Sequence, residues 1–475
     1  MTKGFLIFLL LFNIYHQSSG FFQSPDKVAE KQCFCELKGN VDDCSCSVDT
    51  VDYYNNVKIF PRLKSLLQSN YFRFFKVNLH NDCPFWKDVD FECAMKFCHV
   101  ESCEEKDLPV ELQDDIDDKP KKEAPKDKYL KENQVLGCKE DYNKELDLVN
   151  KSISEKQHEE LQKWSEHDEA QDSFCVLDDH QEKAEYVDLL LNPERFTGYQ
   201  GRSANRIWQT IYKENCFKSP KVSKEQSSYK QLMKTKVLDE TCLEERVFYR
   251  MVSGLHASIN VHLAANFLQS EKDSPLGMVS KNGLWGPNLK EFVARFSPET
   301  TYGEGEKWLR NLYFAYLVEL RAIAKVAPYL RNEEFFTGIE KSDKEVRLAV
   351  NDILNVIEAF PSHFDESIMF NGVNINLKNE FREKFLNISR IMDCVGCDKC
   401  RLWGKLQTQG MGTALKILFS GKFEHNTLEN NIYVTDHPIR DDFKMRRSEI
   451  VALFNAFGRL SSSIYYLELF RNQLR

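Results

Sequence analysis

The chain has 475 residues, a formal net charge of −9, 42% hydrophobic residues and 15 cysteines. The hydrophobic content can fill a sizeable core, and the acidic balance argues against a nucleic-acid partner. The length suits either two to three average domains or one large domain.

The first twenty residues have the layout of a secretory signal peptide. Lys3 precedes an apolar run over residues 4–15, and small residues follow at 18–20. The run is too short to span a membrane as a helix, and no later stretch is long and apolar enough to do so. We therefore expect residues 1–20 to be cleaved on entry to the secretory pathway. A buried N-terminal helix is the alternative.

Entry into that pathway changes the interpretation of the cysteines. In an oxidising compartment, cysteines form disulfides more often than they bind metal. The odd total leaves at least one thiol unpaired or bonded to a partner. Asn150 and Asn387 each begin an N-x-S/T sequon, a short motif that is compatible with glycosylation there.

Residues 33–46, CFCELKGNVDDCSC, place two C-x-C pairs on either side of a turn at residues 39–40. Four cysteines allow three connectivities, and a zinc clip is a competing interpretation. In either case we expect a structural role. Antiparallel pairing across a small hairpin would give two nested disulfides, Cys33–Cys46 and Cys35–Cys44.

Four more cysteines crowd into the next cysteine-rich segment, at positions 83, 93, 98 and 103. A bond between Cys93 and Cys98 would enclose only AMKF, and such a small loop can be strained and more easily reduced than a structural bridge. Ordinary stapling of a loop is the alternative.

Residues 104–134 are dense in Asp, Glu and Lys and contain few large apolar residues. This composition indicates a mobile loop or linker rather than core. Cys138 lies just beyond it, so the segment has thiols at both ends and suits an arm that carries a disulfide from one place to another. A charged linker without a catalytic part is the alternative.

From about residue 180 the sequence predicts a mainly α-helical region with few strands. Pro328 is expected to end the helix that begins at Asn311, because proline lacks the backbone N–H of a helix interior. Cys216 and Cys242 flank a Lys- and Ser-rich connection and could pair. No G-x-G-x-x-G follows a strand pattern, so a Rossmann domain is not indicated. Helical patterns cover residues 201–217, 244–268, 311–328, 344–360, 381–394 and 446–474, and residues 58–80 predict an earlier core helix and its exit.

The helix over residues 244–268 carries two stripes. One is apolar and recurs every four residues. The other is polar and consists of Ser253, His256 and Asn260. A lone histidine on an apolar helix is usually a satisfied core residue, but three short polar groups in line favour a face turned toward a polar ligand.

The segment CVGCDKCRLWGKLQTQGMGTALKILFS begins with Cys394, Cys397 and Cys400 at three-residue spacing, just before a helical pattern. Backbone donors and the dipole at a helix N-terminus favour a thiolate, which is the nucleophile of disulfide exchange. A structural zinc site needs four ligands, and only His425 and His437 follow, without ligand spacing. We therefore favour a redox dithiol of Cys397 and Cys400 over zinc. Creating new disulfides would also require an electron acceptor such as a flavin or a quinone.

Three blocks carry a family resemblance: the cysteine-containing segment just described, SGLHASINVHL and NPERFTGYQG. They resemble the endoplasmic reticulum oxidoreductins of the animal type, which are Ero-type sulfhydryl oxidases, and the likeness runs from Cys33 to LFNAFGRL near the C-terminus. It implies one mainly α domain over residues 21–475. Within that domain we expect the disulfide-stapled hairpin at 33–46, a long flexible shuttle and regulatory loop at about 83–138, and a helical FAD-binding core at about 180–475.

The resemblance also implies an activity. Such an enzyme works in the lumen of the endoplasmic reticulum, reoxidises protein disulfide isomerase, and passes the electrons through FAD to oxygen, giving hydrogen peroxide. Cys93 and Cys98 match the shuttle pair that accepts electrons from the isomerase. Cys397 would exchange with this pair, and Cys400 would transfer electrons to the flavin ring. The implied flavin contacts are Arg195, Thr197, Trp208, Ser253, His256 and Arg295. A further basic contact after GEG has no clear match, and Lys307 and Arg310 are the options.

The remaining cysteines are also assigned by this resemblance. Cys394 would join Cys83, and an inactive form would contain Cys93–Cys138 and Cys98–Cys103. With Cys103–Cys138 and Cys216–Cys242 as the remaining bonds of the active form, Cys175 is the one cysteine left unpaired. No metal is implied. The C-terminal RNQLR lacks a KDEL-type signal, so retention would depend on a partner such as the isomerase, with peripheral association at the luminal membrane face. The alternative function is a disulfide-stapled luminal binding protein with a structural C-x-x-C or a zinc site.

Overall fold

The computed structural model describes residues 36–83, 85, 184–192, 194, 201–215, 217, 243–269, 284–361, 364–370, 374, 377–395, 398–419 and 443–475. These parts of the chain are mainly α-helical, which confirms the predicted fold class. They also contain two antiparallel pairs of short strands. The helices in the described ranges are not long and apolar enough to cross a membrane.

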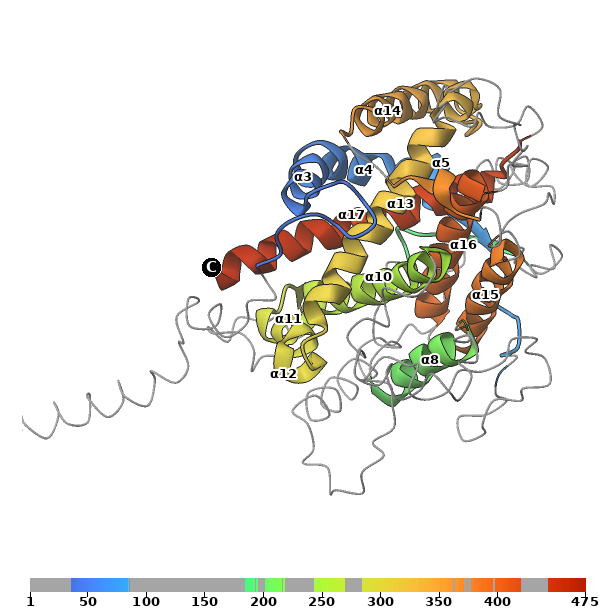
Figure 1. The fold of residues 1–475 in the computed structure, drawn as a ribbon. Coiled ribbons are helices and arrows are strands. Elements are labelled where there is room, and N and C mark those ends of the chain that lie inside the picture. The colour runs from blue at the N-terminus through green and yellow to red at the C-terminus, as the bar shows by residue number, and fades with distance from the viewer. Residues whose placement is uncertain are drawn as a thin grey trace, which may run out of the picture.

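Four long helices form the centre of the molecule, and their shared interior is largely apolar but also buries polar and charged side chains. Helix α13 crosses the middle, with α10 and α17 packed against it, and α16 packs closely on α17 and also contacts α13 (Figure 1). The pattern of apolar residues predicted all four of these helices. Their bounds are α10 Leu243–Ala265, α13 Gly305–Asn332, α16 Asp398–Phe419 and α17 Arg447–Leu474.

Shorter helices surround this centre. Helix α8 packs on α15, and a 3-10 turn, η13, leads from α15 into the segment before α16. Two of the short helices, α3 (Val48–Tyr53) and α11, are each preceded by a side chain that accepts a backbone N–H: Ser47 Oγ accepts from Thr50, and Asn288 Oδ1 from Glu291. The bounds are α8 Gly201–Glu214, α11 Leu289–Phe296, α12 Pro298–Thr301, α14 Glu340–Glu358, α15 Leu377–Ile391 and η13 Met392–Cys394.

The N-terminal helical segment packs along α17 and contains a π-helical turn. At this turn Asn55 Nδ2 donates to the carbonyl of Ser461, and Asn56 Nδ2 donates to Glu468 Oε2. The wider turn lets two consecutive asparagines face the same neighbouring helix. The segment consists of α3 Val48–Tyr53, the π-helix η2 Tyr54–Ile59, α4 Phe60–Leu66 and α5 Asn70–Arg73.

The two strand pairs are local additions to the helical core. Strand β1, Phe74–Val77, pairs with β2, Glu185–Asp188, and β3, Phe267–Gln269, pairs with β4, Leu284–Gly286. The sequence predicted a mainly helical region with few strands from about residue 180, but it did not locate the strand at 185–188. The strand forms because it finds a partner more than a hundred residues earlier, and Arg73 Nε binds Asp188 Oδ1 at 2.8 Å beside it. Local periodicity carries no sign of such a partner.

Helix α13 continues past Pro328 to Asn332, so the predicted end near Pro328 was wrong. The proline ring is exposed, while Val326, Ala327 and Leu330 on either side are fully buried. Burial of these side chains outweighs the missing backbone hydrogen bond. The Pro328 carbonyl also accepts a hydrogen bond from Asn332 Nδ2.

The first described turn is centred on Asp42 and Asp43, later than the turn predicted at residues 39–40. The N–H of Val41 donates to the carbonyl of Cys46 at 2.8 Å, and Arg250 of α10 binds both aspartates. Cys44 and Cys46 are buried. Their predicted partners Cys33 and Cys35 lie outside the described residues, so both disulfides stay predictions.

Candidate active site

An aromatic pair joins α8 to α10. The indole of Trp208 stacks on the imidazole of His256, with ring centroids 3.8 Å apart and planes 13° from parallel. Tyr212, one turn further along α8, places its hydroxyl 3.4 Å from His256 Nδ1. Two of the predicted flavin contacts, from helices far apart in sequence, are therefore in direct contact.

The polar stripe of α10 continues from this pair to α11. Arg295 Nη1 donates to Asn260 Oδ1 at 2.9 Å, and Nη2 binds Glu291 Oε1. The Nε of Arg295 is buried and has no partner among the described residues. At the other end of the stripe, Ser253 Oγ accepts a hydrogen bond from Asn311 Nδ2 of α13. Ser253, His256 and Asn260 are all half-buried, so the stripe borders the core rather than open solvent.

The start of α16 is held by a disulfide and two basic side chains. Cys83 and Cys394 are joined, which confirms that predicted bond. Arg401 donates from Nε to the carbonyl of Val395 at 3.0 Å and from Nη1 to that of Leu79 at 2.7 Å. Cys400 is fully buried in the first turn of α16. Its predicted partner Cys397 lies outside the described residues.

A buried ion pair adds a further restraint at this place. Lys405 Nζ lies 2.6 Å from Asp393 Oδ1, and both side chains are almost inaccessible to solvent. Asp393 directly precedes the disulfide-bonded Cys394. The pair therefore fixes the 3-10 turn η13 against the second turn of α16, and it holds the segment that leads to the predicted dithiol.

Asn192 and Glu194, at the start of the NPERFTG block, connect these features. Trp403 of α16 donates from Nε1 to the Asn192 carbonyl at 2.8 Å, and Arg459 of α17 forms an ion pair with Glu194. His262 Nε2 of α10 lies 3.1 Å from the Arg459 carbonyl oxygen. Burial, with the nearby Arg459 charge, lowers the pKa of His262 to about 3, so its ring is neutral at physiological pH.

Sequence reasoning missed Trp403 and Arg459. Helical spacing gave a signal for Trp403, because it follows Cys400 by three residues and so lies on the same side of α16. Arg459 had no such signal, since its partner Glu194 is more than two hundred residues away. Its position in the long apolar pattern of α17 hid its role.

Several predicted site residues lie outside the described residues: Cys93, Cys98, Cys103, Cys138, Cys175, Cys216, Cys242, Arg195, Thr197 and Asn150. Of the two options after GEG, Arg310 binds the carbonyls of Lys38 and Asn40, at 2.6 and 3.0 Å, and is thus engaged by the N-terminal segment. Lys307 is half exposed and pairs with Glu304.

The asparagine of the sequon that lies within the described residues, Asn387, is not accessible to a glycan. Asn387 lies in α15 and is 5% exposed. Its Nδ2, the atom to which an N-glycan attaches, donates to Asn215 Oδ1 at 3.0 Å. The expectation of glycosylation at Asn387 is therefore incompatible with this packing, because a glycan there would displace α15 from its neighbours.

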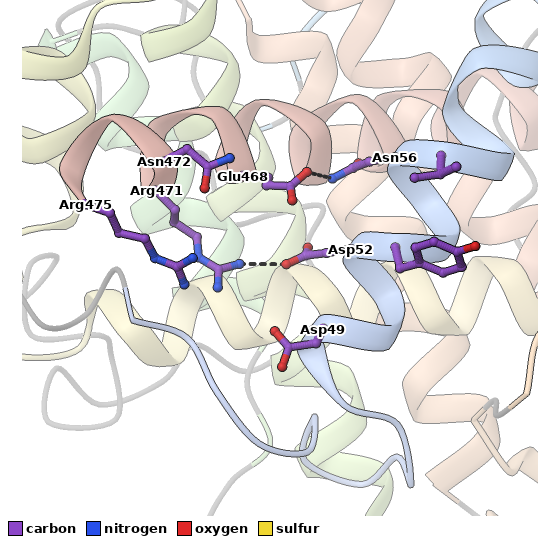
Figure 2. Close-up of a pocket in the computed structure, with 9 residues that line it drawn as sticks. Asp49, Asp52, Asn56, Glu468, Arg471, Asn472 and Arg475 are labelled. Carbon is purple, nitrogen blue, oxygen red and sulfur yellow. Dashed lines mark hydrogen bonds and ion pairs between the residues drawn. The ribbon is translucent and has the colours of Figure 1, made fainter.

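A surface cavity of about 230 Å³ lies apart from all these residues, between the N-terminal helical segment and the end of α17 (Figure 2). Its interior contains the ion pair between Asp52 Oδ2 and Arg471 Nη1, at 2.7 Å. Tyr53 and Glu468 also line it. No residue predicted from the sequence to bind flavin or to exchange disulfides belongs to this cavity.

The fold, the Cys83–Cys394 bond and the buried Cys400 define a mainly helical, disulfide-bonded protein with a buried cysteine at the start of α16. The family model described as Endoplasmic Reticulum Oxidoreductin 1 (ERO1) matches residues 58–467, and the chain belongs to this family. The family resemblance inferred from sequence is thereby confirmed.

Individual relatives agree along nearly the whole chain. The chain is 54% identical to the Ero1-like protein of Drosophila melanogaster, over 99% of this chain and 96% of that protein. It is 45% identical to human ERO1-like protein alpha, over 99% of this chain and 98% of that protein. Among solved structures it is similar to a double mutant of S. cerevisiae Ero1p, at 30% identity with a TM-score of 0.55, over 90% of this chain and 97% of that one. Another Ero1p structure, described as the source of disulfide bonds for oxidative protein folding in the cell, is also 30% identical, with a TM-score of 0.56 over 90% of this chain and 98% of that one.

Proposed function

We propose that this oxidoreductase is an FAD-dependent thiol oxidase that generates disulfides in the lumen of the endoplasmic reticulum. It reoxidises protein disulfide isomerase, and oxygen is the final acceptor, giving hydrogen peroxide. The observation that carries the proposal is the stacking of Trp208 on His256, with Arg295 bound through Asn260 one turn further along α10, in a protein that also buries Cys400 at a helix start.

The residues present fit a flavin dinucleotide in their chemistry. Trp208 and His256 offer a flat aromatic surface for a ring system. Arg295 keeps a buried Nε–H without a partner among the described residues, and a guanidinium is suited to an anionic diphosphate. FAD, when bound, supplies the two-electron acceptor that a dithiol needs if it is to become a disulfide without consuming another disulfide.

The cysteines carry out two successive exchanges. A thiolate of the reduced isomerase attacks the Cys93–Cys98 disulfide, and its second thiol then releases the isomerase in oxidised form and the shuttle pair as a dithiol. A shuttle thiolate next attacks Cys397 of the Cys397–Cys400 disulfide and forms a mixed disulfide, and Cys400 leaves as a thiolate. The second shuttle thiol restores Cys93–Cys98 and frees Cys397. Each exchange transfers two electrons and leaves the number of disulfides unchanged.

The position of Cys400 supports that role. It lies in the first turn of α16, the end of a helix at which backbone N–H groups have no partner within the helix. Arg401, Lys405 and the Cys83–Cys394 bond restrain the approach to this turn. The proposal includes an inactive form with Cys93–Cys138 and Cys98–Cys103, which would remove the shuttle pair from the exchange.

The decisive experiment combines a spectrum with oxygen consumption. The purified protein is expected to be yellow, with a flavin absorption spectrum, and to consume oxygen when given reduced isomerase. Cys397→Ala and Cys93→Ala should each abolish this oxygen consumption, and the Cys93 variant should keep its bound flavin. Cys175→Ala, which changes the cysteine left over by the predicted pairing, is the matched control and should remain active. A folded protein without flavin would refute the proposal, and normal turnover in either variant would remove that cysteine from the relay.

A further inference from the structure

Gln407 of α16 has a side-chain amide that is buried without a hydrogen-bond partner among the described residues. The residue is 6% exposed, and neither Nε2 nor Oε1 has a partner within that part of the chain. Buried side-chain amides normally bond to protein, water or ligand, because an unmade hydrogen bond leaves the cost of removing the group from water uncompensated. An amide with both its donor and its acceptor unmet indicates a partner outside the described backbone and side chains.

The position of Gln407 on α16 indicates where that partner lies. Seven residues separate it from Cys400, which is two helical turns and only about 20° around the axis. Trp403 lies one turn before Gln407 on the same side, and its indole holds the Asn192 carbonyl at the start of the NPERFTG block. Gln407 thus lies on the side of α16 that carries the predicted redox cysteine and contacts a predicted flavin-binding segment.

We infer that the carboxamide of Gln407 hydrogen-bonds the pyrimidine edge of the flavin's isoalloxazine ring. That edge presents an N–H donor between two carbonyl acceptors. A carboxamide offers one acceptor and an N–H donor side by side, so it can form two parallel hydrogen bonds with the ring N–H and a neighbouring carbonyl. This inference rests on the proposed function, because it requires that FAD binds beside Cys400.

The adenine end of the same cofactor is the other partner with matching chemistry, since adenine also presents adjacent donor and acceptor atoms. The isoalloxazine is favoured because Gln407 is on the same side of α16 as Cys400. The ring that accepts electrons must lie near this thiol, whereas the adenine need not.

Gln409 provides a matched control on the same helix. It is also a buried glutamine, 3% exposed, with Oε1 unpartnered in the described structure. Two residues along a helix correspond to a rotation of about 200°, so Gln409 is on the opposite side of α16 from Gln407. A general effect of removing a buried amide from α16 should appear in both variants, whereas an effect on the flavin edge should appear only for Gln407.

The test compares Gln407→Leu, Gln407→Met and Gln409→Leu in the full chain with bound FAD. Both Gln407 variants should bind FAD about tenfold more weakly. They should also shift the flavin absorption bands and lower the flavin midpoint potential, because an N–H bond to a ring carbonyl favours the electron-rich reduced ring. Gln409→Leu should leave affinity, spectrum and potential as in the wild type. The Met variant keeps an unbranched side chain if Leu disturbs packing.

Three results would overturn the inference. Wild-type affinity and spectrum in both Gln407 variants would exclude the contact, and equal losses in the Gln407 and Gln409 variants would make it a packing effect. Weaker FAD binding with an unchanged spectrum and potential would assign Gln407 to the adenine instead. A wild-type protein that binds no FAD refutes the proposed function itself, whereas a yellow wild type with unaffected Gln407 variants refutes only the role of Gln407.

Discussion

Several buried charges in the described part of the chain are paired, and the carboxyl of Glu319 is an exception. Glu366 accepts hydrogen bonds from Arg321 and Lys325, and Lys416 binds Glu449. Glu319, in the middle of α13, is fully buried, and neither carboxyl oxygen has a partner among the described residues. Burial raises the pKa of Glu319 well above its ordinary value, which favours the neutral form of its carboxyl.

Replacing Glu319 by glutamine should therefore stabilise the protein at neutral pH. With a folded-state pKa above the unfolded value of about 4.3, the stability linked to this group is fully present below that value and is lost as pH rises. A glutamine side chain has nearly the same shape but does not ionise, so the stability of the variant does not fall in this way as pH rises. We expect Glu319→Gln to raise the free energy of unfolding by more than about 0.5 kcal/mol at pH 7 and to leave it nearly unchanged near pH 4.

Urea unfolding at both pH values, with disulfides intact, measures this difference. Glu345→Gln is the matched control, because that glutamate is on the exposed face of α14 with a side chain that is 67% accessible. It should change stability by less than about 0.5 kcal/mol at either pH. A Glu319→Gln protein that is no more stable than the wild type at pH 7 would show that the carboxylate is ionised and paired in solution.

At the scale of elements, local pattern predicted the helices and tertiary contacts decided the exceptions. The apolar residues that predict α10, α16 and α17 are buried in the structure, and α16 and α17 are buried on nearly all sides, so the same burial holds these helices in place. The strand at 185–188 and the continuation past Pro328 both depend on neighbours that are distant in sequence. No local rule contains those neighbours, so the sequence predicted neither feature.

The candidate site also combines features that the sequence predicted with features that only the structure shows. The polar stripe of Ser253, His256 and Asn260 was visible from spacing, and the family resemblance added Trp208 and Arg295. The stacking of Trp208 on His256 could not be read from sequence, because α8 and α10 are joined by a long connection. Gln407 was not predicted either, since its significance lies in the lack of a partner among the described residues, which only packing reveals.

The close contact of α16 with α17 depends on a glycine. A Cβ at Gly410 would lie 2.3 Å from Ala456 Cβ and 2.4 Å from the Ala452 carbonyl oxygen. Gly410→Ala should therefore push the two helices apart. The gain of about 1 kcal/mol in helix propensity should be outweighed by overpacking, for a net loss of about 1–2 kcal/mol. Because α16 also carries Cys400, the bound flavin spectrum should change as well.

Gly458→Ala in α17 is the control for this prediction. Its added Cβ would meet Leu67 Cδ1 at 2.4 Å, and this atom is the end of a flexible side chain that can rotate away. We expect its free energy of unfolding to stay within about 1 kcal/mol of the wild type. Equal urea midpoints for the two alanine variants would contradict the view that backbone contact at Gly410 sets the spacing of α16 and α17.

At the scale of the whole molecule, the Cys83–Cys394 disulfide connects the two halves of the chain. It links residues 311 apart in sequence and joins the segment after β1 to the segment before α16. A cross-link over such a separation restricts the unfolded chain strongly. In the folded protein, Arg401 bridges the same two segments through the Leu79 and Val395 carbonyls, so the bond is not their only connection.

Replacing both cysteines of this pair by alanine should show whether the disulfide contributes to the free energy of unfolding, to the position of the start of α16, or to both. We expect Cys83→Ala/Cys394→Ala to lower the free energy of unfolding by about 2–5 kcal/mol, because the unfolded chain gains freedom. The flavin spectrum of the folded variant should stay close to that of the wild type, since Arg401 and the Lys405–Asp393 pair still hold the start of α16. Urea unfolding followed by circular dichroism gives the first quantity, and visible absorption gives the second. If the spectrum changes while the urea midpoint does not, the disulfide serves to position Cys400 and contributes little as a cross-link of the unfolded chain.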